Sequence, residues 1–377
     1  MIRSFRLLPA TEQSHPFCSA AQRCSLAAHG YLEEEYLFTG TACVYRSGPG
    51  GLPEPAVPDV PYANRLILRR PGQPARFSGV VLVEIINSTA DFDIERIWAE
   101  SWRYLVRCGI AYVGITSKPN VLPQLKRFDP TRYGALDWPN PCARTVPRPE
   151  PPVSPVSLGA PDQELGLIWD MLRDLPGLLR GGAPGTPLAG MPARYVYLSG
   201  WSQSCSYINR LVNSFILPAG AAGAALYDGC LAAGGVHHIS TPLNRGEYAR
   251  AVAAADCRID RCPVPLIELN TESENSDAGG FCGYAARRPD SDAPDFRYRY
   301  LDLAGGCHDA ADTGRDYLYY DDDAARALGR ALRGYAHIPL LNDYPKCFAF
   351  HTALHSLRMW AEQGLPPPRL PRIPPQG

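Results

Sequence analysis

Two strongly apolar runs on either side of one helical pattern constrain the fold of this chain more than any other feature. Residues 79–86, GVVLVEII, are almost continuously apolar and β-branched, and so is the run 110–116, IAYVGIT. Such runs are typical of strands buried on both faces of a sheet. Between them, apolar side chains recur at helical spacing from Ile94 to Cys108, and Gly109 is placed to end the helix. This strand–helix–strand order predicts parallel strands.

The same alternation continues along the chain. Further strands are expected at 36–45, 64–69, 195–199, 222–227, 265–270 and 297–303, and further helices at 162–175, 203–215, 321–334 and 346–363. The Pro/Gly-rich stretch 48–61 is expected to be a loop. Asp162 is expected to cap the helix at 162–175. We therefore predict a doubly wound α/β fold with about eight mostly parallel strands.

The alternation of strands and helices persists from residue 79 to residue 303, which predicts one catalytic domain over residues 30–365. Residues 1–29 precede it as an N-terminal extension, and the Pro-rich tail 366–377 is expected to be unpacked. The stretches 117–161 and 233–262 interrupt the alternation. Because loops at the carboxyl edge of such a sheet carry the site, we expect these two insertions to form the pocket walls or a lid.

Charge and cysteine content exclude several classes of protein. The chain has 37 Lys plus Arg and 38 Asp plus Glu, a net charge of −1, so no basic face is indicated for nucleic acid or an anionic membrane. Apolar runs are too short for a membrane span, and the N-terminus lacks the apolar core of a signal peptide. The 12 Cys contain no C-x-x-C pair, which argues against a zinc site or a disulfide scaffold. A cytoplasmic location is expected.

One motif carries chemistry: residues 200–204, GWSQS, lie between an expected strand and an expected helix. A serine on such a tight turn is typical of a nucleophile elbow, in which backbone strain projects the hydroxyl above the sheet. Small residues are needed two positions before and after the serine. Gly200 and Ser204 are both small, although glycine is usual at the second position. We predict Ser202 as a nucleophile; the alternative is an ordinary loop with a capping serine.

A serine nucleophile needs a base, which itself needs an orienting acid. In folds with this elbow, the order along the chain is Ser, then Asp or Glu, then His. Only His308 closely follows an expected strand, within the small-residue stretch LAGGCHD, and it is our candidate base. His351 and His355 lie four residues apart, but no neighbouring Glu or third ligand accompanies them, so we expect helix-face residues. No metal and no cofactor are expected.

The acid is expected in the loop after strand 265–270, which reads NTESEN from residue 270. Two carboxylates are available there, on Glu272 and Glu274. The acid of such a site sits a few residues past the strand end, which favours Glu274. Glu272 stays open as the alternative acid or as a hydrogen-bonding support of the loop.

A tetrahedral intermediate also needs two backbone N–H donors for its oxyanion. One is expected from Gln203, the residue after the nucleophile. The other is expected from the loop after strand 79–86, from Ser88 or its neighbour Thr89. We prefer Ser88, and we interpret Asn87 as a turn former.

The strand–elbow–helix order with Ser202, an acid loop and His308 resembles the α/β-hydrolase fold. Several segments are more specific: VVLVEIINSTADFD, YVGITSKPNVLPQLKRFDPTRY, LSGWSQSCSYINR, IELNTESE, LAGGCHDAAD and LRMWAEQGLPPP. Together they are similar to a mostly bacterial group, the alpha/beta hydrolase domain proteins, over residues 30–370. This resemblance implies a cofactor-free serine hydrolase of carboxylic esters, with Ser202 as nucleophile and His308 as base. In relatives the acid loop tends to end in Asp where this chain has Glu274, which keeps Glu272 open.

Other functions fit the same residues. An acyltransferase or a lactonase would use the same triad, with another alcohol in place of water or with an internal ester. A catalytically silent ligand-binding protein would have lost a member of the triad. With no basic face on the chain, we expect a small, uncharged ester as partner. Tyr133 and Trp138 in the first insertion are candidates for an apolar acyl or alcohol site, or for packing within the loop.

Overall fold

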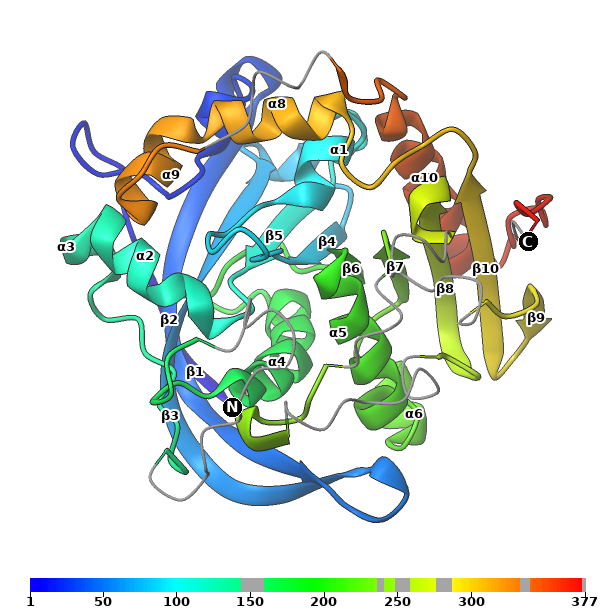
Figure 1. The fold of residues 1–377 in the computed structure, drawn as a ribbon, viewed down its shortest axis with the longest axis horizontal. Coiled ribbons are helices and arrows are strands. Elements are labelled where there is room, and N and C mark those ends of the chain that lie inside the picture. Colours follow the sequence, from blue (N-terminus) through cyan, green and yellow to red (C-terminus); the bar gives the residue numbers. More distant parts are fainter. Residues whose placement is uncertain (144–158, 236–240, 248–257, 276–286, 333–339, 375–377) are drawn as a thin grey trace.

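A mixed sheet runs through the part of the chain that the computed structural model describes, residues 1–143, 159–235, 241–247, 258–275, 287–332 and 340–374 (Figure 1). Within those residues it has ten strands in the order β1-β2-β3-β5-β4-β6-β7-β8-β10-β9. The strands are β1 (Ile2–Leu7), β2 (Tyr31–Ser47), β3 (Pro53–Pro71), β4 (Val80–Ile85), β5 (Ala111–Ile115), β6 (Tyr195–Trp201), β7 (Gly229–Ala233), β8 (Cys262–Thr271), β9 (Ser291–Ala293) and β10 (Phe296–Leu303). Neighbours from β5 to β10 are parallel, and the outer pairs are antiparallel. The sequence therefore predicted the mostly parallel α/β class correctly. Strands β1 and β9 were not expected, and β7 takes the place of the strand expected at 222–227.

Helices cover both faces of this sheet. Helices α1 (Arg96–Arg107) and α10 (Lys346–Gln363) pack on one face, and α4 (Ile168–Gly181) and α5 (Gln203–Leu211) pack on the other. The other α-helices in the described part of the chain are α2 (Leu122–Phe128), α3 (Pro130–Tyr133), α6 (Gly220–Ala224), α8 (Ala311–Tyr319) and α9 (Asp321–Leu328). Strand β4 shows why both faces need cover: Val81 and Val83 enter one apolar core while Leu82 enters the other. None of the helices among the described residues is long and apolar enough to cross a membrane.

The Pro/Gly-rich stretch 48–61 is mainly strand, so its prediction as a loop was wrong. Strand β3 begins at Pro53 and pairs with β2 as a long antiparallel ribbon with bulges. On its other side β3 pairs with β5 only over Leu66–Arg69. The proline-rich half of β3 is therefore an edge, where half of the backbone N–H groups face no partner strand and proline is tolerated.

Residues 222–227 were predicted as a strand, and this was also wrong. They begin within helix α6, and the strand of this region is β7, which starts at Gly229. A short apolar run does not by itself distinguish a strand from a buried helical turn. Half of this run is alanine, and it contains no β-branched residue. It packs closely against the preceding helical turn, since a Cβ at Gly223 would lie 2.0 Å from the Ile216 carbonyl oxygen.

Two helix limits also differ from the prediction. Glu164, and not Asp162, caps the segment before α4: its side chain accepts from the Gly166 N–H and opens a 3-10 turn. The helix expected at 321–334 ends at Leu328, because Gly329 takes a left-handed conformation with φ 70°. Helix α8, which precedes α9, was not predicted.

Both ends of the chain pack against the sheet. Residues of the N-terminal extension form β1 and contribute Phe17 to the main apolar core. The C-terminal tail was expected to be unpacked, but its described part is bound along β10. The Arg299 guanidinium donates to the Pro367 carbonyl over 2.9 Å, and the Ile373 N–H donates to the Asp302 carboxylate over 2.8 Å. The tail thereby adds one partner to each of these two charged groups.

The described residues bear on one part of the prediction that the two insertions form the pocket walls. Tyr133 and Trp138 of the first insertion are fully buried in the main core and do not line an open pocket. The rest of the pocket-wall prediction falls largely on residues 144–158, 236–240 and 248–257, which lie outside the described residues.

Candidate active site

Ser202 lies at the sharp turn between β6 and α5. Its backbone is strained, with φ 60° and ψ −124°, a conformation that is uncommon for a residue with a side chain. Its N–H donates to the Ala233 carbonyl at the end of β7 over 2.8 Å, which anchors the turn to the sheet. A Cβ at Gly200 would lie 2.8 Å from the Ser204 carbonyl oxygen, so only glycine fits where strand and helix pass. This is the local geometry that the spacing of small residues predicts.

His308 lies on the loop after β10, with its ring between two of the predicted site residues. Its Nε2 is 3.0 Å from Ser202 Oγ, and its Nδ1 is 2.6 Å from Glu274 Oε1. The ring packs against Trp201 at a centroid distance of 5.0 Å. The structure thus brings hydroxyl, imidazole and carboxylate into one hydrogen-bonded chain.

Glu274 lies in the 3-10 turn Glu272–Asn275, directly after β8, and is fully buried. Besides His308, it accepts the Thr271 N–H over 2.5 Å and the Thr271 hydroxyl over 2.7 Å. Burial raises the pKa of this carboxyl, but the hydrogen bonds and charge of His308 and the bonds from Thr271 outweigh burial and leave the pKa below its usual value. Glu274 is therefore a carboxylate at neutral pH.

Glu272 points to a different partner. Its carboxylate accepts the Gly305 N–H over 2.8 Å, on the loop that leads to His308. Glu272 thus binds the backbone of that loop. Such a hydrogen-bonding support was one of the two roles expected for it from the sequence.

The loop after β4 places Ser88 and Thr89 differently. The Thr89 N–H donates to the Asn87 side chain over 2.9 Å, so this amide is occupied by an Asx-type turn. Ser88 is fully buried, and its N–H has no hydrogen-bond partner among the described residues. Gln203 begins α5, where the first N–H groups of a helix point away from its body.

Several supporting residues were not predicted from the sequence. The His308 N–H donates to Ser273 Oγ over 2.8 Å, and the His308 carbonyl accepts from Lys346 Nζ over 3.0 Å. Arg96 forms an ion pair with Asp309, the residue after the base. Ser273 carries no local signal, because its role depends on two loops that meet only in the fold. Lys346 does carry a sequence signal, because lysine is rare in this chain, which has three lysines and 34 arginines.

His351 and His355 lie on α10, with their rings against Tyr104 at centroid distances of 5.9 and 6.4 Å. Searched over the described residues, the chain has no group of three or more His, Cys, Asp or Glu side chains that could hold a metal ion.

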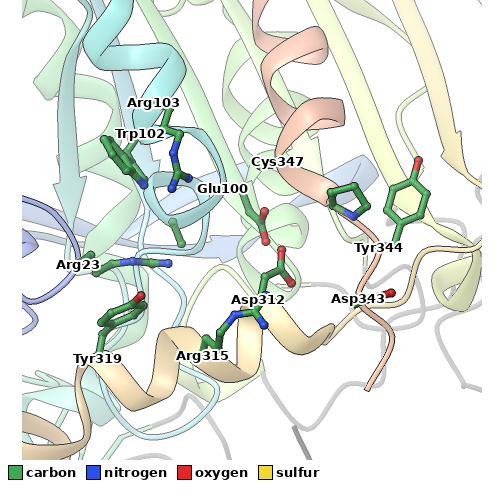
Figure 2. Close-up of a pocket in the computed structure, with 12 residues that line it drawn as sticks. Arg23, Glu100, Trp102, Arg103, Asp312, Arg315, Tyr319, Asp343, Tyr344 and Cys347 are labelled. Atoms are coloured by element: carbon green, nitrogen blue, oxygen red, sulfur yellow. The ribbon is translucent and has the colours of Figure 1, made fainter. Parts of the chain in front are cut away.

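A cavity of about 280 Å³ is lined by residues of α1, α8 and the start of α10 (Figure 2). Its walls include Arg23, Glu100, Trp102, Arg103, Asp312 and Tyr319. Figure 2 shows the carboxylates of Glu100 and Asp312 turned toward each other at its centre. Glu100 is 3.6 Å from Lys346 Nζ, the group that binds the His308 carbonyl, so the cavity adjoins the support of the base. Neither His308 nor Ser202 lines it.

Comparison with known proteins gives one match along nearly the whole chain. A family model described as "Alpha/beta hydrolase domain" matches residues 5–377. No curated protein matches the sequence.

Solved structures similar to this chain include a serine hydrolase without lid from Xanthomonas campestris, at 12% identity and a TM-score of 0.34, covering 77% of this chain and 93% of that one. A phosphonate-inhibited esterase B from Lactobacillus rhamnosis has 12% identity and a TM-score of 0.39, with 87% of each chain covered. An S-formylglutathione hydrolase from Agrobacterium tumefaciens has 10% identity and a TM-score of 0.38, covering 80% of this chain and 96% of that one. Likeness at this level carries no information about substrate.

Proposed function

We propose that this chain, which belongs to the alpha/beta hydrolase domain family, is a serine hydrolase that cleaves small, uncharged carboxylic esters. The reaction would pass through an acyl-enzyme on Ser202, with His308 as base and Glu274 as the orienting acid. The backbone N–H groups of Ser88 and Gln203 would form the oxyanion hole.

In this mechanism His308 Nε2 takes the proton of the Ser202 hydroxyl as Oγ attacks the ester carbonyl carbon. The Nδ1–H stays hydrogen-bonded to Glu274, which stabilises the imidazolium. The Ser88 and Gln203 amides stabilise the negative charge on the former carbonyl oxygen. Nε2–H then protonates the leaving alcohol. In the second half the same nitrogen takes a proton from water, whose oxygen attacks the acyl carbon. The bond to Ser202 Oγ then breaks, the acid leaves, and Nε2–H returns its proton to Oγ.

The observation that carries this proposal is the chain from Ser202 Oγ through His308 to Glu274, with bonds of 3.0 and 2.6 Å. The strained turn at Ser202 supports it, because an ordinary loop serine does not need φ 60°. The Ser88 assignment is supported by its amide, which has no partner among the described residues, while Thr89 binds Asn87. Glu274 is supported over Glu272 by its bond to the imidazole and by its lowered pKa.

A fluorophosphonate probe tests the proposal, because it labels only an activated serine. We expect the label on Ser202 by peptide mapping, and hydrolysis of p-nitrophenyl acetate and butyrate by the same protein. Ser202→Ala and His308→Ala should abolish both.

The matched control is Ser199→Ala, which removes a buried hydroxyl from β6, the strand that precedes the turn. Ser199 Oγ donates to the Val83 carbonyl over 2.9 Å and takes no part in the proposed chemistry. This variant should be labelled like the wild type. Folded wild-type protein that takes no label would overturn the proposal.

A further inference from the structure

A lysine is buried directly beneath the proposed nucleophile turn. Lys118 is fully buried, and its ammonium donates to three acceptors on three different segments. These are the Ile86 carbonyl at the end of β4, over 3.0 Å, Ser117 Oγ after β5, over 2.8 Å, and Ser204 Oγ on α5, over 2.8 Å. Nζ also lies 4.7 Å from the centre of the Tyr207 ring. A buried ammonium with all three N–H groups in use is a fully satisfied donor.

The acceptors of Lys118 also bind one another. The hydroxyls of Ser117 and Ser204 both donate to the Ile86 carbonyl, over 2.7 and 3.4 Å. Each hydroxyl therefore accepts from the ammonium and donates to the same carbonyl oxygen. The result is one closed network that joins the ends of β4 and β5 to the start of α5.

This network connects the two segments that carry the proposed reaction. Ile86 is two residues before Ser88, and Ser204 is two residues after Ser202. An oxyanion hole works only when its donors stand at hydrogen-bond distance from the oxygen of the attacked carbonyl. The separation of these two segments therefore bears directly on the rate.

The choice of lysine at this position is itself informative. The chain has lysine only at 118, 126 and 346, against 34 arginines. Two of the three, Lys118 and Lys346, are almost completely buried, and Lys346 binds the His308 carbonyl. An ammonium is a compact donor whose three N–H groups point in three directions, whereas the guanidinium of arginine is a planar fork. Three acceptors around one point suit lysine and exclude arginine.

We infer that Lys118 is a positioning residue of the proposed hydrolase, which holds the Ser88 amide and the Ser202 hydroxyl at a fixed separation through the Ile86 carbonyl and Ser204 Oγ. The inference rests on the proposed function. Without the ammonium, the segments shift relative to each other and the oxyanion is held less well. Substrate binding in the ground state depends little on this separation, so the loss falls on kcat.

The charge of Lys118 makes the effect dependent on pH. Burial lowers the pKa of the Lys118 ammonium to about 7. The carboxyl groups of Asp93 and Glu84 act in the opposite direction and raise this pKa. Glu84 lies on β4, and its carboxyl accepts from the backbone N–H groups of Ile97 and Trp98 in α1. Asp93, which precedes α1, is itself paired with Arg65 at 3.2 Å. A neutral amine has two N–H groups for three acceptors. The kcat of the wild type should therefore fall as pH rises through this ionisation.

The test compares Lys118→Met and Lys118→Arg with Lys126→Arg, using p-nitrophenyl butyrate as substrate. We expect both variants at 118 to lose kcat by about 10- to 100-fold, with KM within about threefold of the wild type. Lys126 is outside the network, so Lys126→Arg should match the wild type. The alkaline fall in kcat should disappear in Lys118→Met.

Ser204→Ala provides a milder second variant, which decides the question alone if Lys118→Met does not fold by circular dichroism. It removes one acceptor from the ammonium, so kcat should fall about threefold to tenfold and the alkaline limb should move to lower pH. The double variant Lys118→Met/Ser204→Ala should be no worse than Lys118→Met, because the two side chains act as one unit.

Wild-type kcat in Lys118→Met, or a loss with an unchanged pH profile and additive effects, would overturn the inference and leave the proposed function standing. A wild type that neither hydrolyses esters nor takes the phosphonate label would overturn the proposed function, and the inference with it.

Discussion

At the scale of single residues, the turn at Ser202 is determined by close approach. Gly200 is needed because any Cβ would meet the backbone of Ser204. Ser202 itself has φ 60°, which is held by its N–H bond to Ala233 and by the helix that begins at the next residue. Strain of this kind persists only where the surroundings enforce it.

Gly200→Ala should therefore disrupt the turn. We expect a loss of about 1–3 kcal/mol in the free energy of unfolding and at least a tenfold fall in ester turnover. Gly177→Ala is the matched control, because a Cβ there meets nothing within 4 Å and the residue is inside α4. It should be neutral or slightly stabilising. Urea unfolding and turnover of both variants measure the difference, and equal behaviour would contradict the steric account.

The two glutamates of the acid loop should separate in kinetics. Glu274→Gln removes the charge beside the imidazole, and we expect kcat to fall by about 10²- to 10⁴-fold. Glu272→Gln keeps an acceptor for the Gly305 N–H, so its kcat should stay within about threefold of the wild type. Turnover of p-nitrophenyl butyrate at saturation measures both variants. A larger loss in Glu272→Gln would make Glu272 the orienting acid in place of Glu274.

At the scale of elements, each segment takes the conformation that its neighbours permit. Prolines occur within β3 because that half of the strand has a partner on one side only. The C-terminal tail is ordered along β10 because it supplies the Pro367 carbonyl to Arg299, which is 2% exposed. It also supplies the Ile373 N–H to Asp302.

Removing residues 366–377 should therefore destabilise the protein. The deletion leaves Arg299 and Asp302 without these partners, and we expect the free energy of unfolding to fall by about 2–4 kcal/mol. Arg369→Ala is the control, because its ion pair with Asp292 is exposed on both sides and should be worth less than about 1 kcal/mol. Urea denaturation measures both. A deletion as stable as the full chain would mean that the tail contributes nothing.

At the scale of the whole molecule, charges are numerous inside the sheet although the net charge is −1. Glu84 of β4 and Glu268 of β8 are both buried within the sheet. Burial raises the pKa of Glu268 to about 7, while the bond from Tyr298 and the charges of Arg372 and Arg288 oppose the shift. Stability should therefore depend on pH within the neutral range.

The sign of that dependence follows from linkage. The folded protein binds the Glu268 proton more tightly than the unfolded chain does, between the ordinary pKa of 4.5 and about 7. Stability from this group is thus complete below that window and is lost as pH rises through it. The advantage of the wild type over Glu268→Gln should shrink by about 1–3 kcal/mol from pH 4.5 to pH 8 in urea titrations. Glu54→Gln, whose side chain is 41% exposed, is the control; a constant difference would contradict the prediction.

Prediction from the sequence succeeded where the hydrophobic period and burial agree. Strand β4 and helix α10 were placed within a residue or two, because a run buried on both faces and a long amphipathic pattern are each unambiguous. It failed at residues 222–227, where a short apolar run fits helix and strand equally well. It also failed at the tail, whose partners lie more than sixty residues away.

The sequence by itself determined the order of strand, tight turn and helix around Ser202, because that geometry depends on residues adjacent in the chain. Only the tertiary structure decided that the carboxylate of Glu274 contacts His308 while that of Glu272 turns to Gly305. It alone placed Lys118 between three segments. These contacts join side chains from distant parts of the chain, and no local pattern specifies which of them meet.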